Sequence, residues 1–584
     1  MKTKWNLKLL YASPKDPQIE KDVKAIERAY VAFEKKYRGK DFTKNETVLL
    51  KALKDYEKLK EKYGIGKPAI YYWLRKELDG TDANAEAQIR KIEYRFTKAG
   101  NRITFFHLRL GKIEKTLQKK YLRSPALKKY RYYLERIFLT SEHDLSEPEE
   151  KILSLKASTS YDMWVSGVDK AVNKKMVWFK GKSISVNEAM NLIPTIKGKK
   201  MRRKLWSEIM QQFIEISDFA ESEINAVCTS KKVNDELRGF RDPFDATIIS
   251  YENDRKSVLD LVDTVTAGYR ISHRFFKLKT ELLKEKKITY ADRSISIGRV
   301  TKKYPFTNSV ETLREAFSIA DEKYSDILDN FLKEGRIDVY PKQNRSGGAY
   351  CLPGRGEVPT FVLLNDVGDL RSCVTFAHEM GHAIHSERSR EEQDVLYEGY
   401  STAVAETAST FFEGLVFSHL YEKMTRKEKI IALHDRIQDD IATIFRQIAF
   451  FNFELELHTA LRKDGWVPKE RIAQLLNKHT AAYLGPSVKM KEEDGYFFVT
   501  VGHFRRFFYV YSYAYGQLIS KALLSRYQND PTYIKKIDQF LSAGGSKTPE
   551  HIFKDVGINV NKKLFEEGLK SIEEDIKELE RLAK

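Results

Sequence analysis

The sequence Cys373-Val-Thr-Phe-Ala-His378-Glu379-Met-Gly-His382-Ala-Ile-His385 carries the strongest chemical signal in the chain. His378 and His382 are four residues apart, so in an α-helix they share one face, about 6 Å apart along the axis. Two imidazoles placed in this way can bind one metal ion. Glu379 projects beside the pair, where a carboxylate can take a proton from water without being a ligand. This is the spacing of the His-Glu-x-x-His pattern of zinc peptidases.

The residues before this stretch predict a short strand that leads into the helix. Phe361-Val-Leu-Leu364 is an apolar run typical of a buried strand, and the polar residues that follow it predict a turn. Arg345-Ser-Gly-Gly-Ala-Tyr-Cys351 predicts a second strand with a bare backbone, so we expect a small sheet at about residues 338–366. A bare strand edge can bind extended peptides by main-chain hydrogen bonds, but a glycine turn between two structural strands fits the same residues.

A zinc site with two histidines needs a third protein ligand and a position left for water. The segment Tyr397–Glu413 predicts a helix with one small, polar face, and Glu406 lies on that face. Glu406 follows His382 by enough residues for one turnaround and a return helix. We therefore predict Glu406 as the third ligand. Glu398 is the rival, although it lies near the start of the expected helix.

Two more residues lie one or two turns beyond the expected ligands. Glu413 is too far along its helix to share the ion with Glu406, and a third helix-borne histidine, His385, would crowd the coordination face. We interpret both as partners that orient a ligand histidine.

The composition limits the classes of protein. The chain has 584 residues, of which 42% are hydrophobic, so we expect two lobes or a large helical body. The 102 Lys and Arg residues against 83 Asp and Glu give a net charge of +19. A basic protein that binds RNA is the non-enzymatic alternative. Because the cations are scattered along helical stretches, we expect no nucleic-acid partner, and we interpret the densest run, Lys197–Lys204, as a solvated helix start.

The cysteines and the apolar runs indicate where the protein works. The three cysteines, Cys228, Cys351 and Cys373, have no paired spacing, which favours a reducing compartment. The first residues mix charged and apolar side chains, so we predict no secretory signal, and no uncharged apolar run approaches about 18 residues. We therefore expect a cytoplasmic protein with no membrane partner. The sequence carries no signal of the oligomeric state.

Helical patterns fill most of the chain on both sides of one predicted hairpin. Met176-Val-Trp-Phe179 and Ser183-Ile-Ser-Val186 predict two short strands around a Lys-Gly-Lys turn. We place a boundary there, with an N-terminal helical lobe over residues 1–186 and a catalytic region over residues 187–584.

Gly502-His503-Phe-Arg-Arg-Phe-Phe-Tyr509-Val-Tyr511-Ser-Tyr513 gathers several phenols on one short segment. In a helix, Tyr509 and Tyr513 would share a face and Tyr511 would point elsewhere. Buried phenols beside a metal can donate hydrogen bonds to a developing oxyanion. An aromatic stripe of the core has the same pattern.

Taken together, these residues resemble oligoendopeptidase F and its relatives in the thimet oligopeptidase family of zinc peptidases. The likeness rests on His378-Glu-Met-Gly-His382, Ala405-Glu406-Thr-Ala-Ser-Thr, Arg345-Ser-Gly-Gly-Ala-Tyr-Cys351, Phe445-Arg-Gln447 with Glu454, His503 and Tyr509-Val-Tyr-Ser-Tyr513.

The resemblance implies a mainly α, zincin-like fold: a two-lobed helical shell around a deep substrate channel, with a small β-sheet beside the zinc helix. It implies one zinc ion per chain, held by His378, His382 and Glu406. Glu379 would be the general base that activates a zinc-bound water. The implied activity is that of a metalloendopeptidase, which hydrolyses internal peptide bonds of short unfolded peptides.

The resemblance also implies roles for residues after the zinc helices. His503 would bind the substrate, and Tyr509 and Tyr513, with Tyr511 as the alternative, would stabilise the tetrahedral intermediate. A dipeptidyl carboxypeptidase similar to angiotensin-converting enzyme also carries His-Glu-Met-Gly-His. Such an enzyme would release C-terminal dipeptides instead of cleaving internal bonds.

Overall fold

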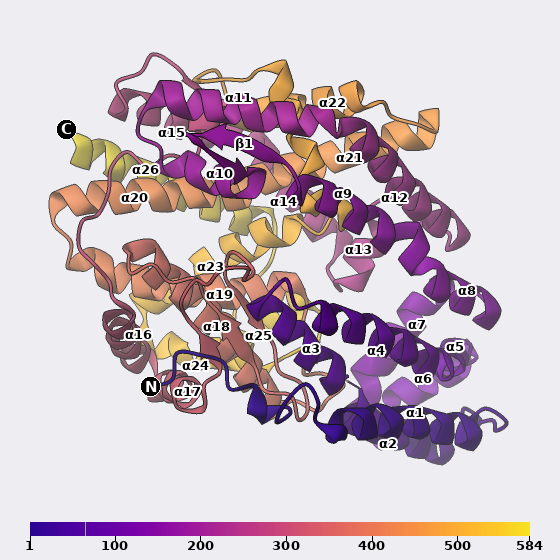
Figure 1. The fold of residues 1–584 in the computed structure, drawn as a ribbon. Helices are drawn as coiled ribbons and strands as arrows, with labels where there is room; N and C mark the ends of the chain where they lie inside the picture. The colour runs from indigo at the N-terminus through magenta and orange to yellow at the C-terminus, as the bar shows by residue number, and fades with distance from the viewer. Residues whose placement is uncertain (65) are drawn as a thin grey trace. The chain divides into compact units, whose positions relative to one another are not determined.

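The computed structural model describes residues 1–64 and 66–584, and the chain is mainly helical (Figure 1). It forms two compact units, each assembled from three separate segments. Unit 1 comprises Met1–Leu155, Lys302–His419 and Leu524–Gly557, and unit 2 comprises Lys156–Thr301, Leu420–Leu523 and Ile558–Lys584. The prediction of a mainly α protein with a small sheet is confirmed, whereas the boundary at residue 186 stays a prediction.

The elements of unit 1 are α1 (Pro17–Tyr37), α2 (Glu46–Tyr63), α3 (Lys67–Leu78), α4 (Ala83–Asn101), α5 (Thr104–Gly111), α6 (Lys115–Arg123), α7 (Arg131–Thr140), α16 (Phe306–Ala320), α17 (Glu322–Glu334), β4 (Ile337–Asp338), β5 (Tyr350–Leu352), β6 (Phe361–Leu363), α18 (Leu370–Glu392), α24 (Ile534–Ser542) and α25 (Pro549–Asp555). Three helices contain a boundary between segments: α8 (Glu147–Ala157), α19 (Thr402–Glu422) and α23 (Tyr511–Asn529).

The elements of unit 2 are α9 (Met163–Asn173), β1 (Met176–Phe179), β2 (Lys182–Ser185), α10 (Val186–Leu192), α11 (Lys199–Glu215), α12 (Ser217–Leu237), α13 (Asp245–Ser250), α14 (Arg255–Ala267), α15 (Tyr269–Leu282), β3 (Ile288–Thr289), α20 (Arg426–Asp440), α21 (Arg446–Asp464), α22 (Lys469–Leu484), β7 (Val488–Lys489) and α26 (Lys562–Ala583). The predicted hairpin is confirmed, since β1 and β2 pair antiparallel. Within residues 1–64 and 66–584, none of the helices combines the length and apolar character that crossing a membrane requires.

The small sheet of unit 1 has the strand order β4-β6-β5. β6 is central and fully buried, pairing in parallel with β4 and antiparallel with β5, where Cys351 lies opposite Val362. The sequence predicted β5 and β6. It missed β4, because a two-residue strand is too short to show an alternating pattern.

Helix α18 begins where the sequence predicted the zinc helix. The side chain of Asp369 caps its N-terminus by accepting a hydrogen bond from the Ser372 N–H at 2.9 Å. Gly368 takes the left-handed conformation, with φ +73°, in the turn before it. The helix packs on β5 and β6 and is also covered by α16, α17 and α24. Its Phe376 and Met380 are buried, and the ring of Phe376 packs on Phe306 of α16, with ring centroids 5.1 Å apart.

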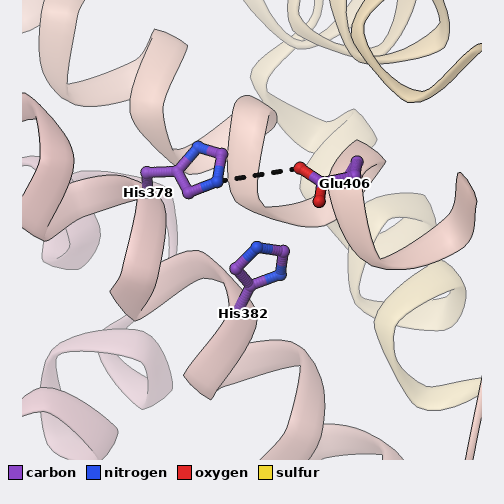
Figure 2. Close-up of side chains that lie close together, drawn as sticks. All are labelled: His378, His382 and Glu406. Carbon is purple, nitrogen blue, oxygen red and sulfur yellow. Dashed lines mark ion pairs between the residues drawn. The ribbon is translucent and has the colours of Figure 1, made fainter. Parts of the chain in front are cut away.

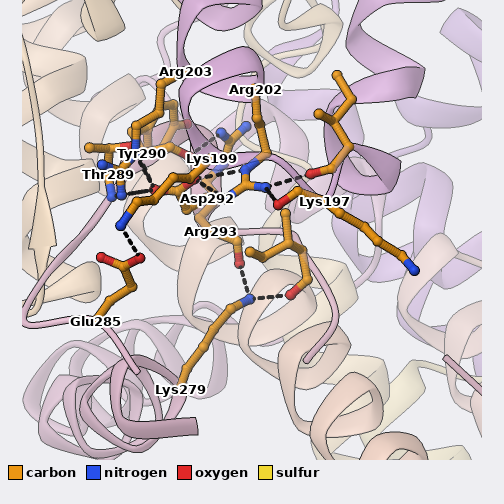
Figure 3. Close-up of polar contacts among 12 residues, drawn as sticks. Lys197, Lys199, Arg202, Arg203, Lys279, Glu285, Thr289, Tyr290, Asp292 and Arg293 are labelled. Carbon is orange, nitrogen blue, oxygen red and sulfur yellow. Dashed lines mark hydrogen bonds and ion pairs between the residues drawn. The ribbon is translucent and has the colours of Figure 1, made fainter. Parts of the chain in front are cut away.

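The densest basic run begins a helix as predicted, but part of it turns inward (Figure 3). Arg202 is only 4% exposed and forms an ion pair with Asp292 at 2.6 Å. Arg203 pairs with the same carboxylate at 2.8 Å. The interpretation of this run as a solvated helix start is wrong for Arg202, since its charge neutralises a buried carboxylate.

Asp292→Ala is expected to destabilise unit 2 by about 3–5 kcal/mol, because a buried guanidinium would lose its carboxylate partner. The matched control is Asp218→Ala, since Asp218 is 82% exposed and its ion pair with Lys469 lies at the surface. That control is expected to change stability by at most about 1 kcal/mol. Urea unfolding followed by circular dichroism measures both; equal effects would contradict the prediction.

Candidate metal centre

His378, His382 and Glu406 converge in unit 1 (Figure 2). One ligand atom from each residue lies within 4.8 Å of the others, and Nε2 of His378 is 3.7 Å from Oε2 of Glu406. Donors bound at about 2.0–2.2 Å around a tetrahedral zinc ion lie about 3–4 Å apart, so the 3.7 Å between His378 and Glu406 fits one ion. Two imidazoles and one carboxylate are also the donor set of catalytic zinc sites that keep a position for water.

Helices α18 and α19 pack so closely beside this group that their backbones are nearly in contact. A Cβ added to Gly381 would lie 2.7 Å from the Cα of Ser409 and 3.1 Å from the Cβ of Phe412. Only a residue without a side chain fits such an approach. Glu406 lies about one turn before Ser409 and is thereby brought to His378. The predicted close approach of the two helices through small residues is confirmed.

Each of the two histidines is oriented by a hydrogen bond from its ring. Nδ1 of His378 donates to Oε2 of Glu413 at 2.8 Å, which turns Nε2 toward Glu406. The ring of His382 donates to the backbone carbonyl of Ala405. An acceptor on one ring nitrogen sets the tautomer and leaves the other nitrogen free to bind a metal. The predicted contact between Glu413 and a histidine of this group is confirmed.

The charges around His378 favour a cation. Burial lowers the pKa of His378, but the hydrogen bond to Glu413 and the nearby carboxylates of Glu379 and Glu406 outweigh it and raise the pKa to about 9. Without a metal, the site therefore attracts a proton to this imidazole. A divalent ion would displace that proton, since metal ligands must be deprotonated.

Glu379 lies beside the group, and only one of its two carboxylate oxygens has a hydrogen-bond partner in the described residues. The backbone N–H of Cys351, on β5, donates a hydrogen bond to its carboxylate. Its Oε2 is buried and has no hydrogen-bond partner among the residues that the structure describes. Burial raises the pKa of Glu379 to about 7, although the charge of His378 opposes the shift. A carboxylate held in this way is well suited to proton transfer near neutral pH.

Two residues considered in the sequence lie outside the group. His385 is fully buried and stacks on Tyr400, with ring centroids 3.7 Å apart. In the described part of the chain neither ring nitrogen of His385 has a hydrogen-bond partner, so the prediction that it orients a ligand histidine is wrong. The rival ligand Glu398 instead accepts a hydrogen bond from the Gly356 N–H at 3.2 Å.

Glu413→Gln is expected to weaken metal binding by about tenfold to a hundredfold, because His378 loses the charged acceptor that orients its ring. Competition with a chromophoric chelator measures the affinity. Glu422→Gln, an exposed position on the same helix, is the control and should leave the affinity unchanged. Identical affinities for the two variants would show that Glu413 does not act on the metal.

The other predicted residues form a cluster in unit 2. Nδ1 of His503 lies 2.6 Å from the phenol oxygen of Tyr509, which is 3.4 Å from that of Tyr513. Tyr511 is fully buried and donates instead to Oδ1 of Asn253 at 2.9 Å. Tyr509 and Tyr513 thus lie together and Tyr511 points elsewhere, as the spacing predicted, although Tyr509 precedes α23 and is not part of it.

The chain has relatives along nearly its whole length. The model of Peptidase family M3 matches residues 195–569, and that of Oligopeptidase F matches residues 110–166. An oligoendopeptidase F homolog of Borreliella burgdorferi is 28% identical, over 96% of this chain and 94% of its own. Oligopeptidase PepF of Bacillus subtilis is 23% identical, over 98% of this chain and 87% of its own.

A solved structure shows the same fold. Oligoendopeptidase-F from Enterococcus faecium superposes with a TM-score of 0.72, covers 97% of each chain and is 19% identical. The family match extends over more than half of the chain and includes His378, His382 and Glu406. This chain therefore belongs to Peptidase family M3 and is a metalloendopeptidase.

Proposed function

We propose that the chain is a zinc-dependent oligoendopeptidase, which hydrolyses internal peptide bonds of short unfolded peptides. The observation that carries the proposal is the group of His378, His382 and Glu406, whose ligand atoms lie within 4.8 Å of one another. The donor set supports zinc, and membership of Peptidase family M3 supports the reaction. We propose one zinc ion per chain, because the residues that the structure describes contain one such set of donors.

The residues of this site divide the work of hydrolysis. His378, His382 and Glu406 would hold the zinc ion, which supplies Lewis-acid polarisation of the scissile carbonyl and lowers the pKa of water. Glu379 accepts a proton from the attacking water through Oε2 and then delivers it to the leaving amine. The N–H of Cys351 holds the other carboxylate oxygen, so Glu379 keeps its orientation through both transfers.

The edge strand β5 supports a way of binding the substrate backbone. Among the described strands β5 pairs only with β6, which leaves its other edge for an added strand. We propose that an extended peptide pairs with this edge by main-chain hydrogen bonds. Because Cys351 belongs to β5 and also anchors Glu379, the same strand would place the substrate backbone and the general base in one register.

We propose that His503, Tyr509 and Tyr513 bind the substrate and stabilise the negative charge that develops on the carbonyl oxygen. Burial lowers the pKa of His503 to about 4, so its imidazole is neutral at pH 7. In the tautomer with the proton on Nδ1, the ring donates to the phenol oxygen of Tyr509. That arrangement leaves the phenolic hydrogen for the substrate.

The three free cysteines, Cys228, Cys351 and Cys373, support a reducing, cytoplasmic location for this activity. The proposed partner is an oligopeptide substrate. Neither nucleic acid nor a membrane has a role in the proposal.

Product mapping tests the proposal against a dipeptidyl carboxypeptidase. The zinc-loaded chain is incubated with an internally quenched oligopeptide blocked at its C-terminus, and the products are identified by mass spectrometry. We expect cleavage at internal bonds of the blocked peptide. Complete resistance of that peptide, together with release of dipeptides from its unblocked form, would favour the carboxypeptidase instead.

A further inference from the structure

Phe507 and Phe508 adopt the left-handed backbone conformation directly before Tyr509. Their φ angles are +49° and +61°. Bulky L-residues rarely take this conformation, because Cβ then crowds the following carbonyl, and two in succession are rarer still. Such a turn persists only where the surrounding structure holds it, and strain of this kind gathers at functional sites.

Two side chains hold the peptide group that joins Phe507 to Phe508, one on its N–H and one on its carbonyl. Oε1 of Glu454, on α21, accepts a hydrogen bond from the Phe508 N–H at 2.9 Å. Oγ1 of Thr247, on α13, donates to the Phe507 carbonyl at 2.9 Å. Glu454 and Thr247 therefore fix the orientation of this peptide group.

The setting of Glu454 is unusual for a carboxylate. Its side chain is fully buried, and within the described residues its Oε2 has no hydrogen-bond partner. Burying a polar group without complete hydrogen bonding costs free energy. An apolar, well-packed residue would serve stability better at this position, so the acidic side chain indicates a specific local role.

The residues around the turn are fixed as well. The ring of Phe508 packs on Phe451 and His458, with centroids 5.3 and 5.0 Å away. Just before the turn, the guanidinium of Arg505 is held by both carboxylate oxygens of Glu223, at 2.9 and 2.7 Å. With the chain fixed on this side, the conformation at residues 507 and 508 decides where Tyr509 points.

We propose that Glu454 is a positioning residue for peptide hydrolysis, which holds the left-handed turn at Phe507 and Phe508 so that the Tyr509 phenol meets His503. The result of this placement is the 2.6 Å contact between the phenol and Nδ1 of His503. When the Phe508 N–H loses its acceptor, the turn relaxes toward negative φ and carries the phenol away from the imidazole. The inference rests on the proposed function, since it assigns Glu454 to the same reaction.

Two pairs of variants test the turn in the full-length, zinc-loaded chain. Glu454→Leu and Thr247→Val each remove one hydrogen bond, whereas Glu454→Gln and Thr247→Ser keep an acceptor and a hydroxyl. We expect Glu454→Leu to lower kcat by about tenfold to a hundredfold on an internally quenched peptide, and Thr247→Val by a smaller factor. The conservative variants should retain kcat. Thermal unfolding shows which variants fold. Thr247→Val changes a smaller side chain, so it still tests the turn if Glu454→Leu fails to fold.

The same substitutions in a Tyr509→Phe background separate positioning from general damage. If Glu454 acts through the phenol, Glu454→Leu and Thr247→Val should each change kcat by less than about twofold once the phenol is gone. Equal losses with and without the phenol, full activity of Tyr509→Phe, or full activity of both hydrogen-bond variants would overturn this inference alone. A wild-type chain that hydrolyses no peptide would overturn the proposed function together with it.

Discussion

Glu379→Gln is expected to lower kcat for peptide hydrolysis by about a hundredfold to ten-thousandfold, the usual contribution of a general base. Glutamine keeps the shape of the side chain and an oxygen that can accept from the Cys351 N–H. Its amide cannot take a proton from water, however, and cannot deliver one to the leaving amine. Because Glu379 is not one of the proposed ligands, the metal content should stay that of the wild type.

Turnover of an internally quenched peptide and elemental analysis of the purified variant measure the two quantities. The matched control is Glu391→Gln, since Glu391 lies on the same helix and its side chain is 55% exposed. That variant should hydrolyse the peptide at the wild-type rate. Wild-type turnover by Glu379→Gln would exclude it as the base, and loss of metal in this variant would show that Glu379 supports the metal directly.

Glu406→Ala is expected to weaken zinc binding by more than about a hundredfold and to abolish hydrolysis at limiting zinc. Removing a ligand should lower the zinc affinity more than removing a residue that only orients a ligand. The wild-type chain should lose its activity on dialysis against a chelator and regain it with stoichiometric zinc. The variant should regain activity only at much higher zinc concentrations, or not at all.

The rival ligand supplies the control for this prediction. Glu398 lies just before α19, and its carboxylate accepts a hydrogen bond from the Gly356 N–H instead of joining the metal group. Glu398→Ala removes that carboxylate. It is expected to keep stoichiometric zinc and hydrolysis. If Glu406→Ala kept its zinc and Glu398→Ala lost it, Glu398 would be the third ligand and Glu406 would not.

The parts of the site that follow from local helix geometry could be predicted from the sequence. The four-residue spacing of His378 and His382 places both rings on one face of any helix. The small face of α19 predicted that Glu406 could reach them, and the close approach at Gly381 is the physical basis. Glu413 lies two turns past Glu406, too far to share the ion, which predicted that it orients a ligand histidine; that histidine is His378, through Nδ1.

Features that depend on the backbone or on distant partners could not be predicted in this way. The N–H of Cys351 that anchors Glu379 is a main-chain group, and every residue type except proline has one. Arg202 looked like a surface cation because its partner, Asp292, is far away in the sequence. His385 carries the spacing of an orienting residue, but stacking on Tyr400 determines its place.

The left-handed turn at Phe507 and Phe508 was the least predictable feature. Glycine and asparagine are the usual sequence signals of positive φ, and neither stands at these positions. The conformation depends on Glu454 and Thr247, which come from other helices.

Anomalous diffraction at the zinc absorption edge, on crystals of the chain purified without added chelator, tests the central claim most directly. The account predicts one strong peak per chain, about 2.0–2.2 Å from Nε2 of His378, a ring nitrogen of His382 and a carboxylate oxygen of Glu406. An enzyme that hydrolyses internal peptide bonds but shows no peak among these three side chains, or shows its only peak elsewhere, would contradict it.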